Sequence, residues 1–325
     1  MHLLLLLLLC FIGLTGRAAS APADTLRPVG PVRLLAYTYA NDLFFRTDYY
    51  FTQGMTLTLV HPVLAGWPTR HLLASGPAGS TQYHGLTLRY DGFTPLRIQD
   101  AFIRLGDRPY AAYLYASLFR ISNQPVRRQR LTTALELGFI GPAAGGKELQ
   151  TAIHRVTGNA VPRGWDYQVR NAPIVGYRAA FEKQLVGARY AELLGNAEAS
   201  LGTLYTYTGS GLRLRAGRFS PYFDNLGIAG SDRRAKKLGW QLFGQATLEG
   251  RLIGYDATLQ GSLLTNRDPY TLAAADVRRA TLRSSGSIVV VHNSLRFEAM
   301  ATWLSAEFAG GRSHRWGQLG VTAAF

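Results

Sequence analysis

The last twelve residues, "HRWGQLGVTAAF" (314–325), decide the fold class. Leu319, Val321, Ala323 and the terminal Phe325 alternate with glycine, threonine and alanine. Successive side chains of a strand point to opposite faces, so this segment is expected to be a strand with one apolar face. A chain that ends in an aromatic residue on such a strand is typical of outer-membrane β-barrels. A soluble β-sandwich would also alternate, but this chain end favours the membrane barrel, with the barrel assembly machinery as a partner.

The same period-2 pattern recurs upstream, and segments of about ten alternating residues are the sequence signature of such barrels. "GMTLTLVH" (54–61), "HGLTLRYD" (84–91), "LTTALELGF" (131–139), "LRLRAG" (212–217) and "LRFEAMATW" (295–303) all alternate. Their polar faces carry both glutamate and arginine. We therefore expect a lumen filled by ion pairs, because a small barrel leaves little interior space.

The pattern predicts an all-β fold: a twelve-stranded antiparallel transmembrane β-barrel in one domain, residues 22–325. An even strand count with both termini in the periplasm places the connections 42–52, 93–110 and 140–172 on the cell surface. The long connections 62–81 and 220–238 would then face the periplasm, where turns are usually short. The expected strands are 32–41, 53–61, 82–92, 111–121, 129–139, 173–185, 189–204, 209–219, 239–255, 277–292, 294–308 and 314–325.

The N-terminus reads as a secretory signal peptide, residues 1–21. An apolar run, Leu3 to Leu14, is followed by the small residues Ala19-Ser20-Ala21, and the run is too short to span a membrane. Cys10 suggests a lipoprotein, but the preceding Leu8-Leu9 argue against that cleavage site. The mature chain then has no cysteine, so no disulfide stabilises it.

The net charge is +15, and 31 of the 35 basic residues are arginine. Guanidinium groups bind phosphate bidentately, so the charge suits anionic lipid, lipopolysaccharide or nucleic acid. Export argues against nucleic acid. An arginine-rich genome would produce the same excess without any function.

One segment departs from the strand pattern. "GGKELQTAIHRVTG" (145–158) predicts a short amphipathic helix over about 145–157, on the extracellular rim. Gln150 and His154 are four residues apart and share one face. Leu149, Ile153 and Val156 lie on the neighbouring face and are expected to pack on the barrel. A single helical histidine is usually structural, but this helix shares its rim with other polar residues.

These polar residues lie in the first hairpin and just before the fourth strand. Asn41 and Asp42 end one strand and Thr52 opens the next, so their oxygens are expected to face each other and to suit a hard cation. Asparagine and aspartate there are also ordinary turn formers. Asp107 and Arg108 precede Pro109; a surface ion pair and a contact from Arg108 to a lipid phosphate are the two interpretations.

Other catalytic motifs are absent: there is no G-x-S-x-G, H-E-x-x-H, Walker loop or cysteine-based zinc site. His292 and Ser294 in "VHNS" suggest a serine esterase. They fall in an expected periplasmic turn, where a hydrogen-bonding role is the simpler interpretation.

With these segments in view, the chain resembles the lipid A 3'-O-deacylase family of outer-membrane barrels. The similarity covers nearly the whole mature chain and is most specific in the helical segment. It is carried by "ND" (41–42), "TDYYFTQG" (47–54), "GDRPYAAYLY" (106–115), "ELGFIGPAAGGKELQTAIHRVTG" (136–158), "GWDYQVRN" (164–171) and "TLQG" (258–261).

The resemblance implies an enzyme in the outer membrane of a Gram-negative bacterium that hydrolyses the ester of the 3'-acyloxyacyl chain of lipid A, using Ca²⁺. We expect it to be a monomer. It implies that His154 is the general base and that Gln150 orients water or substrate. Asn41, Asp42 and Thr52 match the cation positions, with Asn41 and Asp42 expected to be catalytic and Thr52 to contact substrate. Asp107 and Arg108, with Arg104 nearby, match the third rim element and are also expected to contact substrate.

The chain departs from the family in its acidic residues. Where an acidic residue often follows the helix, this chain has Asn159-Ala160-Val161-Pro162, and Ala172 stands where glutamate is common. Fewer carboxylates weaken a hard-cation site. These losses motivate an alternative, a structural or lipopolysaccharide-binding barrel without enzymatic activity.

Overall fold

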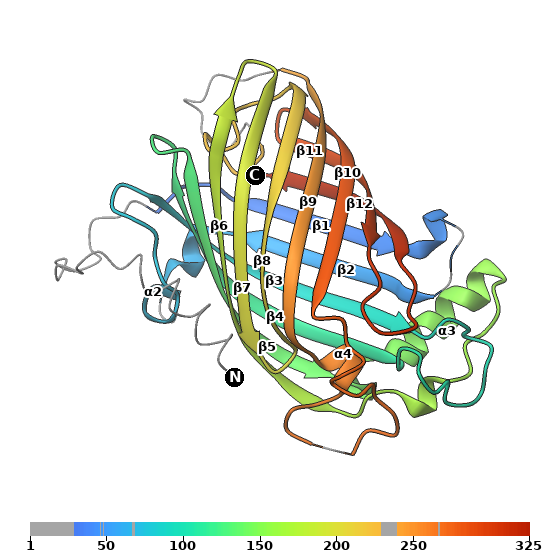
Figure 1. Ribbon diagram of the computed structural model, residues 1–325. Helices are drawn as coiled ribbons and strands as arrows, with labels where there is room; N and C mark the ends of the chain where they lie inside the picture. The colour runs from blue at the N-terminus through green and yellow to red at the C-terminus, as the bar shows by residue number, and fades with distance from the viewer. Residues whose placement is uncertain (1–28, 46, 48, 67–68, 229–238, 266) are drawn as a thin grey trace.

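The computed structural model describes residues 29–45, 47, 49–66, 69–228, 239–265 and 267–325. Twelve antiparallel strands pair in chain order, and β1 closes onto β12 (Figure 1). The predicted barrel is confirmed. The predicted signal peptide, residues 1–21, lies outside the described residues.

The strands match the predicted ones, with most ends shifted by one to three residues and none by more than four. Their bounds are β1 Leu34–Asn41, β2 Tyr50–Val60, β3 Thr81–Thr94, β4 Ala111–Gln124, β5 Gln129–Ile140, β6 Ala172–Gly187, β7 Ala191–Gly202, β8 Tyr205–Arg218, β9 Gln241–Asp256, β10 Ala280–His292, β11 Leu295–Leu304 and β12 His314–Ala324.

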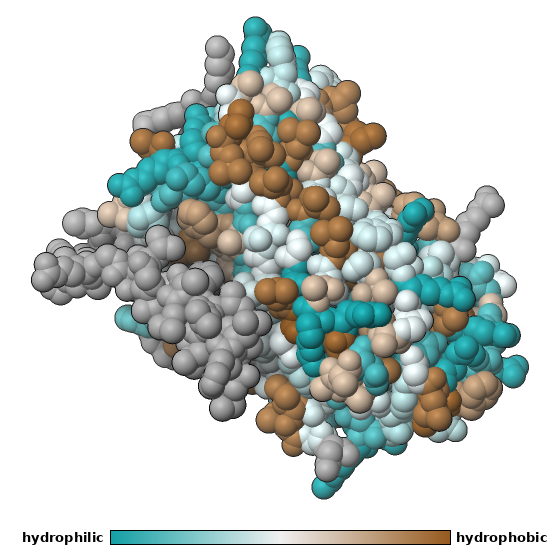
Figure 2. Space-filling model, viewed as in Figure 1, coloured by the Kyte–Doolittle hydropathy of each residue, from teal (hydrophilic) through white to brown (hydrophobic). Residues whose placement is uncertain are grey.

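The two faces of the wall differ as the alternation predicts. Apolar residues at alternate positions point outward and are exposed, including Leu57, Leu88, Leu137, Leu212, Leu248, Phe297 and Leu319. Figure 2 shows such apolar side chains on the strand wall that faces the viewer, with hydrophilic ones gathered toward the ends. This outer face suits hydrocarbon. None of the helices in the described part of the chain is long and apolar enough to cross a membrane.

Ion pairs fill the lumen, as predicted. Arg178 contacts Glu136 at 3.4 Å and Glu198 at 3.5 Å, and Arg251 contacts Glu198 at 3.6 Å. Further inward pairs are Arg89–Asp91, Arg213–Glu182, Arg215–Glu192, Arg251–Glu249 and Arg296–Glu298. These pairings matter because a charge left unpaired in a confined interior would be costly.

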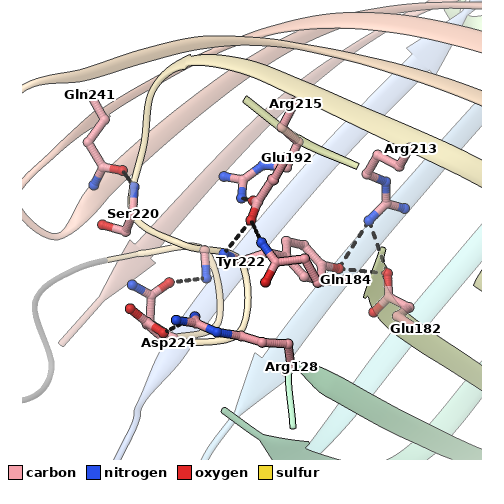
Figure 3. A network of polar contacts seen from close by, with 12 residues as sticks. Arg128, Glu182, Gln184, Glu192, Arg213, Arg215, Ser220, Tyr222, Asp224 and Gln241 are labelled. Atoms are coloured by element: carbon pink, nitrogen blue, oxygen red, sulfur yellow. Dashed lines mark hydrogen bonds and ion pairs between the residues drawn. The ribbon is translucent and has the colours of Figure 1, made fainter. Parts of the chain in front are cut away.

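We call the barrel end where β1 ends and β2 begins the α3 rim, and the other end the opposite rim. At the opposite rim, the chain after β8 folds back against inward-facing side chains (Figure 3). Tyr222 donates to Glu182 (2.8 Å) and accepts from Arg213 (3.0 Å). Burial raises the pKa of Tyr222, so its hydroxyl stays protonated and keeps donating. Arg130 donates to the carbonyls of Tyr222 and Asn225.

This closure predicts that the protein does not conduct ions. In planar bilayers we expect no steady conductance from the wild type, because residues 219–228 and the lumen ion pairs obstruct the path. The Arg130→Ala variant loses the bonds that hold the Tyr222 and Asn225 carbonyls, and we expect it to show intermittent openings. Steady porin-like conductance of the wild type would contradict the closed lumen.

The α3 rim carries most of the helical structure. The predicted helix is present as α3, Gly146–Thr157, and it ends where Gly158 adopts φ 71°, a left-handed conformation that favours glycine. One rim helix was expected, but α4, Ala257–Gln260, lies on the same rim after β9, and the 3-10 helix η1, Asp42–Phe45, follows β1. At the opposite rim, α2 (Thr69–Leu72) lies in the long connection after β2. Short 3-10 turns also occur at Pro62–Ala65, Pro142–Ala144 and Trp165–Tyr167.

Candidate active site on the outer wall

The first hairpin brings Asn41 to the outer face of the α3 rim, and Asp42 follows it in the turn. Asn41 shares the face of Leu35 and Tyr37, which are exposed on the outside. Its Oδ1 accepts from the Leu43 amide at 2.7 Å. Asp42 is buried, and its Oδ2 accepts from the Tyr49 amide at 3.0 Å. Both side chains therefore stabilise the turn, as the turn-former interpretation expects, while carboxylate and amide oxygens retain lone pairs.

Thr52 lies beside this turn because the ladder between β2 and β3 is irregular there. Asn41 pairs with Gln53, and the β2–β3 register shifts between Phe51 and Gln53. A bulge of this kind re-aims a side chain at a barrel rim. An added Cβ at Gly92 would lie 3.4 Å from Thr52 Cγ2 and 3.1 Å from the Tyr90 hydroxyl. Glycine at position 92 thus gives these outward side chains room to gather.

The 3-10 helix η1 bounds the site on one side. Phe44 packs on the outer face of β12, where an added Cβ at Gly317 would lie 2.7 Å from Phe44 Cβ. Since Gly317 pairs with Asn41, η1 lies over β12 beside the end of β1.

Helix α3 bounds the site on the other side, and it lies outside the barrel. Its buried residues are Gly146, Gln150 and His154, which are spaced four apart on one face. Gly146 lies over β4, because an added Cβ there would be 2.6 Å from Ala112 Cβ. Gln150 Nε2 donates to Thr52 Oγ1 on β2 at 3.1 Å. The helix therefore crosses the strands from β4 toward β1, and its next turn carries His154 toward the Asn41–Asp42 turn.

The packing of α3 reverses one expectation. Leu149 contacts the apolar cluster of Tyr90, Tyr110, Ala112 and Trp165. Val156, expected to pack on the barrel, is instead 89% exposed. The polar residues face the protein, because Thr52 on β2 and Trp165 in the connection between β5 and β6 offer polar partners beneath α3.

A hydrogen bond fixes the orientation of the His154 ring. Nδ1 lies 2.6 Å from the carbonyl oxygen of Ala160. A carbonyl only accepts, so Nδ1 carries the proton and Nε2 of the neutral ring is left as the base. Nε2 has no hydrogen-bond partner within the described part of the chain. The segment after the helix, where the sequence lacks an acidic residue, thus orients the histidine through its backbone.

The oxygens of Asn41, Asp42 and Thr52 are the ligand types that a hard cation prefers. They include a single carboxylate, and no group of three or more His, Cys, Asp or Glu among the described residues is placed to hold a metal. The donor set therefore fits Ca²⁺ in kind, with low charge, and a site of this composition is expected to bind weakly.

The third predicted element does not join this outer site. Arg108 is 1% exposed; it pairs with Glu307 (2.5 Å), donates to Thr258 (2.6 Å) and lies over the inward-facing Phe93 ring. Asp107 accepts from the Leu96 and Arg108 amides. These contacts close the mouth of the barrel.

Arg104, predicted to contact substrate, contacts Asp100 at 2.5 Å and Asp107 at 3.3 Å. Its partners are thus both within the connection between β3 and β4. The guanidinium therefore stabilises this connection.

The sequence left Trp165, Tyr90 and Gln53 without a role, although they build the site. Trp165 is buried, and its Nε1 donates to Gln150 Oε1 at 2.7 Å. Tyr90 accepts from Gln53 Nε2 at 3.3 Å. Trp165 lies in the segment 164–171 quoted above. A tryptophan shortly after the helical segment, with an indole N–H that needs an acceptor when buried, was the signal available in the sequence.

The close packing around Gly146 allows a test of how firmly α3 is held against the barrel. In Gly146→Ala, the new Cβ would lie 2.6 Å from both Ala112 and Trp165. We expect α3 to be displaced, at a cost of about 1–3 kcal/mol for overpacking, and trypsin to cleave faster at Arg155. Gly250→Ala is the control, since nothing lies within 4 Å of its Cβ. Equal cleavage of both variants would contradict the packing.

The serine-esterase pair lies far from this site, in the turn between β10 and β11 at the opposite rim. The His292 ring stacks on Trp240 at 4.2 Å. Its Nε2 faces the Asn293 amide at 3.3 Å, and no hydrogen bond joins His292 to Ser294 in the described part of the chain.

One solved structure shares this architecture with a TM-score above 0.5. The structure of LpxR from Salmonella typhimurium superposes with TM-score 0.71 at 20% identity, over 90% of this chain and 100% of that one. The β-domain of the Bordetella autotransporter BrkA gives TM-score 0.46 at 12% identity, over 91% of this chain and 100% of that one. No curated protein sequence matches.

The family model described as "Outer membrane protein LpxR" matches residues 3–325. That match covers nearly the whole chain, including all twelve strands and α3. The barrel is accordingly an outer-membrane protein of a Gram-negative bacterium, and the chain belongs to the LpxR family.

Proposed function

We propose that this protein is a lipid A deacylase that hydrolyses the ester of the 3'-acyloxyacyl chain, with His154 as general base. The observation that carries the proposal is the His154 ring, held by Ala160 on a helix that covers the lipid-facing wall. The family and the outer-membrane barrel support the substrate class. A site on the outer wall at the α3 rim would meet lipid A in the outer leaflet without removing it from the membrane.

The chain's own residues suit ester hydrolysis. His154 Nε2 would take a proton from water as its oxygen bonds to the ester carbonyl carbon. The carbon–oxygen bond to the sugar would then break, and the imidazolium would return the proton to the departing sugar hydroxyl. Gln150 would position Thr52, and Thr52 would contact the substrate.

Asn41, Asp42 and Thr52 would hold Ca²⁺ if the metal is used. When bound, Ca²⁺ would supply Lewis-acid polarisation of the ester carbonyl. The single carboxylate implies that the metal is exchangeable, so activity should depend on free Ca²⁺ concentration.

Isotope labelling tests the hydrolytic step. We expect purified protein in detergent, with lipid A and Ca²⁺ in H₂¹⁸O, to release a 3-acyloxyacyl acid that carries one ¹⁸O, because water attacks the acyl carbon. Label in the sugar hydroxyl would contradict this mechanism. No released acid on several lipid A types would favour the alternative that the weak metal set motivates, a structural or lipopolysaccharide-binding barrel.

A further inference from the structure

Three buried polar side chains form a directed chain of hydrogen bonds beneath α3. Trp165 Nε1 donates to Gln150 Oε1 at 2.7 Å, and Gln150 Nε2 donates to Thr52 Oγ1 at 3.1 Å. The three side chains are 1%, 0% and 3% exposed. Water therefore cannot substitute freely for any of these contacts.

The indole decides the direction of this chain. An indole N–H only donates, whereas an amide can present either its oxygen or its nitrogen. The Gln150 oxygen must therefore face Trp165, which turns the amide nitrogen toward Thr52. Thr52 must accept this bond, so its own hydroxyl proton points elsewhere. No other side chain or carbonyl in the described part of the chain accepts that proton.

The indole is also held rigidly. An added Cβ at Gly146 would lie 2.6 Å from Trp165 Cη2, and the Trp165 ring centroid lies 4.9 Å from that of Tyr110. Close packing on both sides leaves no alternative rotamer for Trp165. The donor that sets the chain's polarity is therefore preorganised.

We propose that Trp165 is a positioning residue that forces the Thr52 hydroxyl to donate its proton to an oxygen of the bound lipid ester. This inference rests on the proposed function. A donor that is aimed in advance costs no reorganisation when negative charge develops on the ester oxygen. Without Trp165 the Gln150 amide could flip by 180°. Thr52 would then donate its proton to Gln150 Oε1 instead of to the substrate.

Kinetics test the role of Trp165. We expect Trp165→Phe to lower kcat about tenfold or more with little change in KM, since an aimed donor acts mainly in the transition state. Gln150→Glu keeps the shape but can accept from both neighbours, so it should lose kcat similarly. Thr52→Val should lose at least as much, and adding Trp165→Phe to it should have no further effect. Trp240→Phe at the opposite rim is the matched control and should keep wild-type kcat.

A spectroscopic measurement separates this inference from the proposed function. The five tryptophans give five indole ¹⁵N–¹H signals, and Trp165→Phe identifies one. That signal should move upfield in Gln150→Leu and downfield in Gln150→Glu, whether or not the protein hydrolyses lipid A. If the wild type is inactive, the proposed function fails. The shifts then still show whether the Trp165 indole donates to Gln150. An unmoved indole signal, or wild-type kcat in Trp165→Phe, would overturn the inference.

Discussion

His154→Ala is expected to lower the kcat for lipid A deacylation about 10³-fold, within the usual contribution of a positioned general base. KM should change little, because the ring is buried against the wall and held by Ala160. The rate is measured by mass spectrometry of released acyl groups.

The matched control for this variant is Arg155→Ala, the next residue on α3, whose side chain is exposed. It should hydrolyse lipid A at the wild-type rate. If His154→Ala hydrolyses lipid A as fast as the wild type, His154 is not the general base. That result would not contradict the barrel fold.

Asp42→Asn should raise the Ca²⁺ concentration needed for half-maximal activity about tenfold or more, because it removes the only carboxylate from the proposed ligands. The fold should survive, since the Asn side-chain oxygen can still accept from the Tyr49 amide. The measurement is a titration of deacylation against free Ca²⁺, with ⁴⁵Ca binding as an independent readout.

Asp166→Asn serves as the control for charge. Asp166 is an exposed carboxylate that pairs with Lys147 at 2.7 Å near the start of α3, so its loss should leave the Ca²⁺ requirement unchanged. A wild type that is fully active in chelator, or an Asp42→Asn variant with an unaltered titration, would argue against Ca²⁺ at these oxygens.

The barrel was predictable because two-residue alternation is a direct consequence of strand geometry. The alternation of Leu319 and Val321 with less exposed residues holds from Gln318 to Thr322 in β12, and the limits of α3 follow from its flanking glycines, Gly145 and Gly158. The helix α4 and the partners of Arg108 were not predictable, because Thr258 and Glu307 meet Arg108 only after the barrel closes.

The site was predictable in its residues and less so in its arrangement. Spacing alone placed Gln150 and His154 on one face. The exposure of Val156 was missed, because the rule that an apolar face packs inward does not hold where the inner face of the helix meets a polar partner such as Thr52. The Thr52 bulge and the Ala160 contact to His154 depend on register and loop conformation, which periodicity does not encode.

The most direct test is a tandem mass spectrum of lipid A after incubation with the purified protein in detergent, with Ca²⁺ and with chelator. The account predicts loss of one acyloxyacyl unit from the 3' position, and only when Ca²⁺ is present. Intact lipid A under both conditions, across several lipid A types, would contradict the deacylase and leave a binding or structural barrel.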